Sequence, residues 1–406
     1  MNAINNCEVC GNTSLIEVLD LGKHPMCDDL VEVGDARVCK EYPIEILYCN
    51  VCRTGHQKFQ VPKEELFPSS YHYRSRFTAD VLSGMSGLVD SCEEKFGDLD
   101  KKVILDIGCN DGSLLDFFKE KGSITLGIEP TDAYKDADLK GHEVYSDYLS
   151  VELAEDILKT HGHPSIITFT NVFAHIEDLD GVLASLKVLQ DKDTKIVIEN
   201  HYLGAVLDGN QFDTFYHEHP RTYSYTSFKF MAKTLGINLE AVEFPSRYGG
   251  NIRVFMGLNS KMDNQPTLDD LDKKESLFEE QFKELKSNID KWIISKDSII
   301  KSLLEQNGKI NAKAFPGRSA ILVKMLNIDE SVISAVYEKP GSLKIDHYVP
   351  GTRIPILSDD DLLASDDLDK PLLNLAWHIS SEIHGYLKSS GFIGPIVDIL
   401  DLDDFR

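Results

Sequence analysis

The stretch that most constrains the fold is KKVILDIGCNDGSLL, residues 101–115. A run of aliphatic residues leads into a turn with two glycines, and the residues after the turn predict a helix that begins near Ser113. This order is typical of the first turn of a doubly wound α/β sheet, where glycines let the backbone approach a ligand at the carboxyl edge of the strands. The stretch lacks the GxGxxG fingerprint and the Lys-Ser/Thr pair of a P-loop, so a pyrophosphate is not its natural ligand.

Further strands follow the first. ITLGI, residues 124–128, ends at Glu129, which is placed to accept hydrogen bonds from two ribose hydroxyls, although a solvated loop charge is an equal alternative. Strand-like segments continue at 142–149, 165–173 and 194–203, and their alternation with helical stretches predicts one parallel sheet.

Two CxxC pairs predict a metal site. Cys7 with Cys10 and Cys49 with Cys52 form knuckles that can aim four thiolates at one zinc ion, and a closed site of this kind is structural. Ordinary reduced thiols or one redox CxxC are the alternatives. Among the other cysteines, Cys27 and Cys39 are read as non-ligands or alternates, and Cys92 and Cys109 as packing residues.

The charge balance limits the partners. With 67 acidic against 42 basic residues in 406, the net charge of −25 argues against nucleic acid and anionic membrane as partners. A few arginines in a pocket could still bind an anionic small molecule. No stretch approaches the roughly 20 apolar residues of a membrane span, and the N-terminus lacks the features of a signal peptide, so we expect a cytoplasmic protein. The oligomeric state is left open, a monomer included.

A polar cluster stands at residues 216–219, in FDTFYHEHPRTYSYTS. Tyr216, Glu218 and His219, with His175 after the fourth strand, offer a base near neutrality and donors for a developing oxyanion. Such groups would suit proton removal beside a ketone, with the charge held as an enolate. A metal site is a competing interpretation, although HEH lacks the spacing of HExxH, and a polar surface loop is another.

The glycine turn and Glu129 together resemble the Rossmann-like methyltransferases that use S-adenosylmethionine (SAM). That resemblance implies cofactor contacts from the turn, a ribose contact from Glu129, and an adenine contact from Asp147 and Tyr148 after the third strand, with packing an open alternative for Tyr148. The complete set of predicted cofactor-binding residues is Asp106, Gly108, Asn110, Asp111, Gly112, Glu129, Asp147, Tyr148 and Asn171.

The order of motifs is more specific than any one of them. Seven motifs in order resemble the bacterial sugar C-methyltransferases, which act on nucleotide-linked 4-keto-deoxysugars. The motifs are CxxCG, CxxC, LDIGCNDGSLL, NVFAHIEDL, FDTFYHEH, RYGGNIRVF and YVPGTRIPI. The resemblance implies a zinc-binding lobe (1–68), a methyltransferase domain (69–262), and a helical connector with a second Rossmann-like domain (263–406). It places the base on His219, with Tyr216, Glu218 and His175 beside it, and favours Tyr73 over Tyr71 as a further site tyrosine.

The chain departs from that family at one turn. Ala314 to Ala320, AFPGRSA, replaces a turn rich in glycine, so the donor nucleotide is in doubt. Four arginines are predicted to bind substrate phosphates: Arg247, Arg253, Arg318 and Arg353. Structural pairing is the alternative for Arg247 and Arg253, and a surface position is the alternative for Arg318. The sequence therefore predicts a SAM-dependent C-methyltransferase. O- or N-methylation of a sugar or related metabolite, and a non-catalytic partner that keeps cofactor or sugar binding, are the alternatives.

Overall fold

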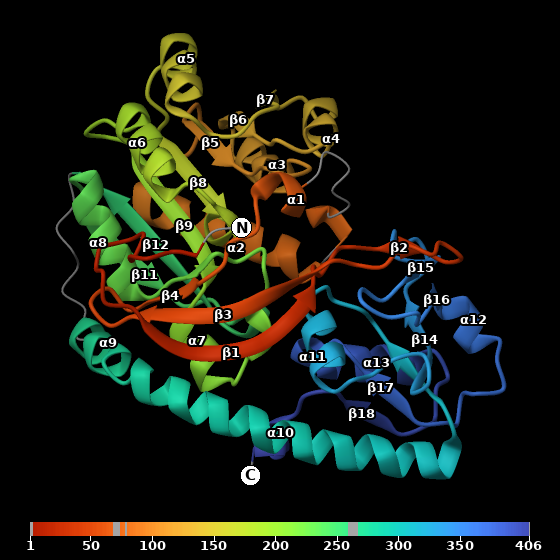
Figure 1. The fold of residues 1–406 in the computed structure, drawn as a ribbon. Coiled ribbons are helices and arrows are strands. Elements are labelled where there is room, and N and C mark those ends of the chain that lie inside the picture. The colour runs from red at the N-terminus through yellow and green to blue at the C-terminus, as the bar shows by residue number, and fades with distance from the viewer. Residues whose placement is uncertain (1–2, 68–73, 78, 259–266, 406) are drawn as a thin grey trace. The chain divides into compact units, whose positions relative to one another are not determined.

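The structure is a computed structural model, and it describes residues 3–67, 74–77, 79–258 and 267–405 (Figure 1). The chain forms two compact units. Unit 1 contains Met1–Ile16, Leu47–Val206 and Glu218–Glu279, and unit 2 contains Glu17–Ile46, Leu207–His217 and Glu280–Arg406. The YHEH motif is thus divided in sequence between the units, after His217.

Unit 1 is built around a seven-stranded sheet in the order β11-β12-β9-β8-β5-β6-β7. Its strands are β5 (Val103–Ile107), β6 (Ile124–Ile128), β7 (Glu143–Tyr145), β8 (Ile166–Thr170), β9 (Lys195–His201), β11 (Asn238–Glu243) and β12 (Asn251–Gly257). β5 to β9 run parallel, as predicted. The prediction of one parallel sheet was incomplete, because β12 pairs antiparallel with β9 and β11 pairs antiparallel with β12.

Helices accompany this sheet in unit 1. They are α2 (Ala79–Phe96), α3 (Ser113–Glu120), α4 (Tyr134–Leu139), α5 (Val151–His161), α6 (Leu179–Leu189), α8 (Tyr225–Leu235) and α9 (Thr267–Glu275), with α7 (Leu203–Asp208) running across the division. α9 contacts α8. α3 begins at Ser113, as predicted. Cys92 and Cys109 lie in the apolar core with Leu88 and Phe118, which confirms them as packing residues.

Shorter elements precede this core. They are β1 (Ile16–Pro25), β2 (Val31–Glu32), β3 (Glu41–Cys49), β4 (Thr54–Gln57) and α1 (Lys63–Leu66). In unit 1, β4 pairs antiparallel with β10 (Arg221–Thr222), so that Arg221 lies opposite His56. The segment directly after the YHEH motif therefore pairs with the strand that directly follows the second knuckle, Cys49 with Cys52.

Unit 2 contains a second parallel sheet, in the order β16-β14-β13-β17-β18. Its elements are α10 (Phe278–Asn307), β13 (Ile310–Lys313), α11 (Ser319–Met325), β14 (Ile333–Glu338), β15 (His347–Tyr348), β16 (Ile356–Ser358), α12 (Asp359–Leu363), β17 (Leu372–Asn374), α13 (Ser380–Ser389) and β18 (Ile396–Asp398). This confirms the predicted second Rossmann-like domain. The helical connector that the resemblance implies is also found, as α9 and α10 with a break between them. No helix of the described residues is both long and apolar enough to cross a membrane.

Candidate active site and metal centre

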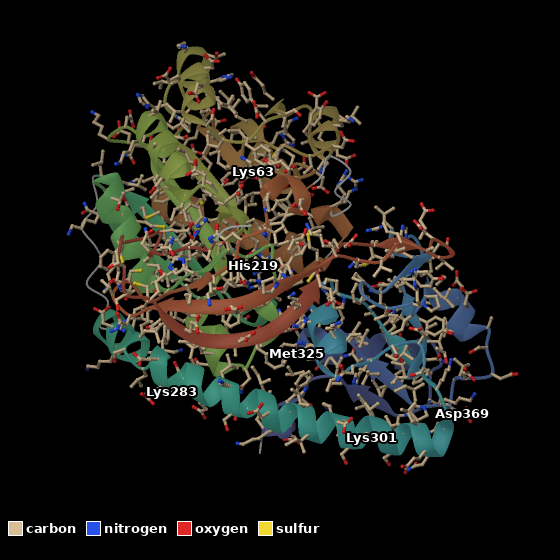
Figure 2. The ribbon with its side chains drawn as sticks, in the orientation of Figure 1. Lys63, His219, Lys283, Lys301, Met325 and Asp369 are labelled. Carbon is tan, nitrogen blue, oxygen red and sulfur yellow. The ribbon has the colours of Figure 1, made fainter. Side chains whose placement is uncertain are left out.

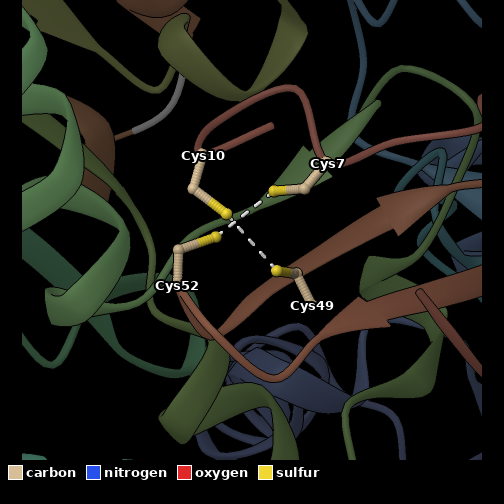
Figure 3. A group of neighbouring side chains, drawn as sticks. All are labelled: Cys7, Cys10, Cys49 and Cys52. Carbon is tan, nitrogen blue, oxygen red and sulfur yellow. Dashed lines mark hydrogen bonds between the residues drawn. The ribbon is translucent and has the colours of Figure 1, made fainter. Parts of the chain in front are cut away.

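Four cysteine thiols gather at one point in unit 1 (Figure 3). All Sγ atoms of Cys7, Cys10, Cys49 and Cys52 lie within 4.8 Å of one another, and Cys7–Cys52 and Cys10–Cys49 approach to 3.3 and 3.6 Å. Four sulfurs bound at about 2.3 Å to one tetrahedral zinc ion are separated by roughly 3.8 Å. The thiols therefore fit a closed, structural zinc site.

Polar side chains surround the thiols. His56 Nε2 lies 3.3 Å from Cys7 Sγ, and Thr54 Oγ1 lies 3.0 Å from Cys52 Sγ. Asn12 Nδ2 donates to Cys49 Sγ at 3.5 Å. Such outer partners orient metal ligands and moderate their charge.

The glycine turn after β5 has the tight backbone that the sequence predicts. Gly108 has φ 71°, and a Cβ there would lie 2.6 Å from Val172 Cγ1, so a larger residue would displace a neighbour. Asn110 is also left-handed, at φ 50°, and its Oδ1 accepts a hydrogen bond from the Ser75 amide at 3.0 Å. A Cβ on Gly112 would lie 2.8 Å from His142 Cδ2. The turn is consequently fixed close to the sheet edge.

Glu129 is held beside this turn. Its Oε2 accepts from the Asn110 amide at 3.0 Å, while its Oε1 accepts from the amide and hydroxyl of Thr131 at 2.8 and 2.5 Å. A carboxylate oxygen can accept two hydrogen bonds, so Oε2 keeps capacity for a ligand hydroxyl. The position and orientation of Glu129 fit the predicted contact with a ribose.

Two further acids lie around the turn. Asp106 Oδ1 accepts from Thr168 Oγ1 at 2.7 Å, and burial raises the pKa of Asp106 to about 7. A cationic ligand nearby would favour its ionised form. Asp111 accepts hydrogen bonds from Ser113 Oγ at 2.6 Å and from the Arg76 amide at 3.0 Å. It therefore links the first residue of α3 to the segment at Arg76.

The residues predicted for adenine follow β7. Asp147 is exposed, and its Oδ1 accepts from the Tyr148 amide at 2.7 Å. Lys63 Nζ of α1 lies 4.2 Å from the centroid of the Tyr148 ring (Lys63 is labelled in Figure 2). Burial raises the pKa of the Tyr148 hydroxyl. The ring is therefore held by a cation–π contact within unit 1.

Polar atoms without partners lie at the ends of β8 and β9. Among the described residues, Thr170 Oγ1 and Asn200 Nδ2 are buried and make no hydrogen bond. Each unpaired atom costs about 1–3 kcal/mol, which a polar ligand at this edge would offset. Asn171, with φ 54°, places its Oδ1 3.2 Å from Asn251 Nδ2.

Three histidine rings gather at the same edge, two of them within the predicted site. His219, which is labelled in Figure 2 and is 5% exposed, has its ring centroid 4.9 Å from that of His175 and 5.2 Å from that of His201. His175 Nδ1 lies 2.7 Å from the carbonyl oxygen of Glu218. Desolvation lowers the pKa of His175, so its ring stays neutral near pH 7 and donates Nδ1–H to that carbonyl. Phe67 packs edge-on against His175 at 5.4 Å.

The rest of the YHEH motif lies in unit 2. His217 Nε2 donates to the Tyr42 carbonyl at 3.0 Å, and burial lowers the pKa of His217 to about 4. Tyr216 is also in unit 2. Tyr73 falls outside the described residues, as does Tyr71.

Arg247 and Arg253 form ion pairs with one buried carboxylate. Glu199 of β9 accepts from Arg253 Nε at 2.7 Å and from Arg247 Nη1 at 3.2 Å. Arg253 Nη1 also lies 2.9 Å from Glu243 Oε2. The structure thus shows the structural pairing that the sequence left open for these two arginines.

The two remaining arginines are engaged within unit 2. Arg318 donates to the buried Asp213 through Nε at 2.8 Å and Nη2 at 2.5 Å, and Trp377 Nε1 donates to the same carboxylate at 2.8 Å. Arg353 donates to the carbonyl oxygens of residues 35, 36 and 37 and lies over the Tyr348 ring. Phosphate binding by either arginine would compete with these contacts.

Comparisons with known families cover most of the chain. Residues 7–67 match a zinc-binding domain, residues 72–242 a methyltransferase domain, and residues 246–393 a C-methyltransferase C-terminal domain. C-methyltransferase NovU of Streptomyces niveus is 25% identical over 410 residues, which cover 97% of this chain and 96% of the relative. The chain is a SAM-dependent C-methyltransferase.

Solved structures resemble parts of this C-methyltransferase more weakly. Magnesium protoporphyrin IX methyltransferase (ChlM) from Synechocystis PCC 6803 with bound SAH is 13% identical, with a TM-score of 0.35, over 44% of this chain and 84% of that one. PH0226 from Pyrococcus horikoshii OT3 is 13% identical, with a TM-score of 0.36, over 48% and 98%. These likenesses are too weak to add to the assignment.

The cofactors of the C-methyltransferase are SAM and structural zinc. SAM supplies an electrophilic methyl group. The narrow glycine turn, the fixed carboxylate of Glu129 and the unpartnered atoms of Thr170 and Asn200 fit a polar ligand at the carboxyl edge of the sheet. The four thiols fit the zinc ion.

One residue near the C-methyltransferase site was missed from the sequence. His201 is the last residue of β9, and the prediction that singled out His175 after β8 did not include it. The available signal was its position, because polar residues at the carboxyl ends of neighbouring parallel strands meet at one edge.

Proposed function

We propose that this C-methyltransferase methylates a carbon next to a ketone in a nucleotide-linked deoxysugar, after His219 removes a proton from that carbon. The observation that carries this proposal is the cluster of His175, His201 and His219 at the carboxyl edge of the methyltransferase sheet. A neutral imidazole is the side chain best suited to act as a base near pH 7.

The reaction would proceed by proton removal and then carbon attack. The C–H bond next to the ketone breaks, His219 takes the proton, and the electron pair moves into an enolate. The enolate carbon then attacks the methyl group, so that a carbon–carbon bond forms as the bond from methyl to sulfur breaks. Tyr216, Glu218, His175 and Tyr73 are proposed to position the base and stabilise the enolate oxygen.

The cofactor is proposed to contact the residues around the glycine turn. Glu129 would accept from the ribose hydroxyls, and Tyr148 would pack on the adenine, next to Lys63. The remaining proposed contacts are from Asp106, Gly108, Asn110, Asp111, Gly112, Asp147 and Asn171.

A nucleotide on the substrate is proposed from the resemblance in motif order. Of the four arginines suggested for its phosphates, Arg353 is favoured, because its guanidinium donates to backbone carbonyls rather than to a carboxylate. Arg253 and Arg318 would have to leave buried carboxylates to bind phosphate, which is costly.

The test is product analysis in deuterated water. The protein is incubated with SAM and a panel of nucleotide-linked 4-keto-deoxysugars, and products are examined by mass spectrometry and NMR. We expect one added methyl on a ring carbon, together with exchange of the neighbouring proton. His219→Ala should abolish both methylation and exchange, whereas His217→Gln, two residues away, should keep both.

Other products would redirect the assignment. A methyl on oxygen or nitrogen, with no exchange at carbon, would replace the proposal by O- or N-methylation. Unchanged methylation by His219→Ala would exclude His219 as the base.

A further inference from the structure

Arg221 is a fully buried arginine that follows the proposed base by two residues. Its exposed fraction is 0%, and it lies in β10, opposite His56 of β4. A charge buried to this degree is costly unless its donors are all engaged. The partners of Arg221 therefore indicate what it is for.

One side of the Arg221 guanidinium contacts the zinc knuckle. Nη1 lies 2.6 Å from Oε2 of Glu8, which stands between Cys7 and Cys10. The same carboxylate oxygen accepts from Gln60 Nε2 at 2.8 Å and lies 3.5 Å from His56 Nδ1. His56 in turn reaches Cys7 Sγ. Glu8 is thus tied to the metal site both along the chain and through His56.

The other side of the guanidinium contacts the segment after His175. Nη2 donates to the carbonyl oxygens of Ile176 and Glu177, the two residues that follow His175 directly. Nε donates to Tyr223 Oη at 3.0 Å. All these groups belong to unit 1. One planar group therefore fixes the backbone next to His175, the strand after His219 and the zinc knuckle.

We propose that Arg221 is a positioning residue, which sets the spacing of the His175 and His219 rings and links that spacing to the zinc knuckle through Glu8. The proposal rests on the function proposed for these histidines. A guanidinium holds its donors in a rigid plane, so the two histidine segments cannot shift relative to the knuckle without breaking buried hydrogen bonds. The zinc ion would then act on catalysis without contacting substrate.

The test uses zinc-loaded Arg221→Met, Arg221→Lys and Glu8→Gln proteins. The control is Lys195→Met, which removes the ion pair between Lys195 and Glu240 in unit 1. Lys195 begins β9, whereas His201 of the histidine cluster ends it. Bound zinc, the imidazole NMR signals of His175 and His219, the KM for SAM, and kcat are measured for each.

We expect Arg221→Met and Glu8→Gln to keep one zinc ion per chain and the KM for SAM, to shift the signals of both histidines, and to lower kcat roughly 10- to 100-fold. Arg221→Lys should restore only part of the loss, because an ammonium cannot reproduce the planar set of contacts. Lys195→Met should leave all four readouts unchanged.

Two results would overturn the inference. Unshifted histidine signals in folded, zinc-loaded Arg221→Met would show that the residue does not position these rings. Loss of zinc from both Arg221→Met and Glu8→Gln would show that the network serves only to retain the metal. The zinc and NMR readouts need no substrate, so they stay interpretable even if the proposed sugar reaction fails.

Discussion

His217 and His219 are two residues apart, yet their rings contact different partners. An extended backbone would place both rings on one face, with Glu218 opposite. Residues 217 and 218 instead form a turn, so His217 bonds to the Tyr42 carbonyl while His219 joins the histidine cluster. The sequence could identify the residue types and the zinc ligands, whose spacing is local. It could not show that His217 bonds to Tyr42 and that His219 packs against His201, because these partners are distant in sequence.

The buried His217 predicts a pH dependence of stability. Its pKa is about 4 in the folded chain and about 6.5 in an unfolded one, so between these values only the unfolded chain binds the proton. Stability is therefore lost as pH falls, by about 2 kcal/mol between pH 7 and pH 5 for this group. His217→Gln keeps a donor for the Tyr42 carbonyl but does not titrate.

The measurement is urea unfolding of both proteins at pH 7 and pH 5. We expect the variant to lose less stability on acidification than the unmodified chain. An equal loss in both would show that His217 is not the group responsible.

At the scale of elements, local patterns were predicted better than pairings. The start of α3 at Ser113 follows from the glycine turn before it, and the parallel strands follow from their alternation with helices. β11 and β12 were not predicted, because β12 carries Arg253 within it and its ion pair with Glu199 forms only once β12 pairs with β9. A charged residue in a strand is hard to interpret without its partner.

Two glycines of α2 provide a matched pair of substitutions. A Cβ on Gly84 would lie 1.6 Å from Arg247 Nη1, whereas a Cβ on Gly87 meets nothing within 4 Å. Gly84→Ala should displace Arg247 from buried Glu199 and destabilise the protein by about 1–3 kcal/mol. Gly87→Ala should stabilise it slightly, by up to about 1 kcal/mol, because alanine favours a helix.

The measurement is the melting temperature of each variant and of the unmodified chain, by thermal unfolding. Equal melting temperatures for Gly84→Ala and Gly87→Ala would mean that the contact between α2 and Arg247 contributes little.

At the scale of the whole molecule, the order of motifs predicted the resemblance to C-methyltransferases. The three consecutive domains predicted from it did not show that the two compact units alternate along the sequence. The chain passes from one unit to the other after residues 16, 46, 206, 217 and 279. Residues 17–46 and 207–217 come early in the sequence and group with residues 280–406. Contacts such as Arg318 with Asp213 are separated by a hundred residues, so no local pattern reveals them.

A chain cut at the predicted boundary should therefore fold poorly. Residues 1–262 contain buried groups such as Tyr42 and Asp213 but lack residues 280–406 of the same unit. We expect this fragment to aggregate or to bind a hydrophobic dye, as measured by size-exclusion chromatography and fluorescence. A monodisperse fragment that melts cooperatively would contradict the expectation.

The same interleaving limits how unit 2 could be exchanged for that of a relative. A hybrid that exchanges only the segment after α9 for that of a relative would combine a foreign sheet with native residues 17–46 and 207–217, which belong to the same compact unit as the original sheet. Tyr216 lies in the second of these segments. A complete exchange of unit 2 would thus require three separate grafts, and one of them carries a residue proposed to act in the chemistry itself.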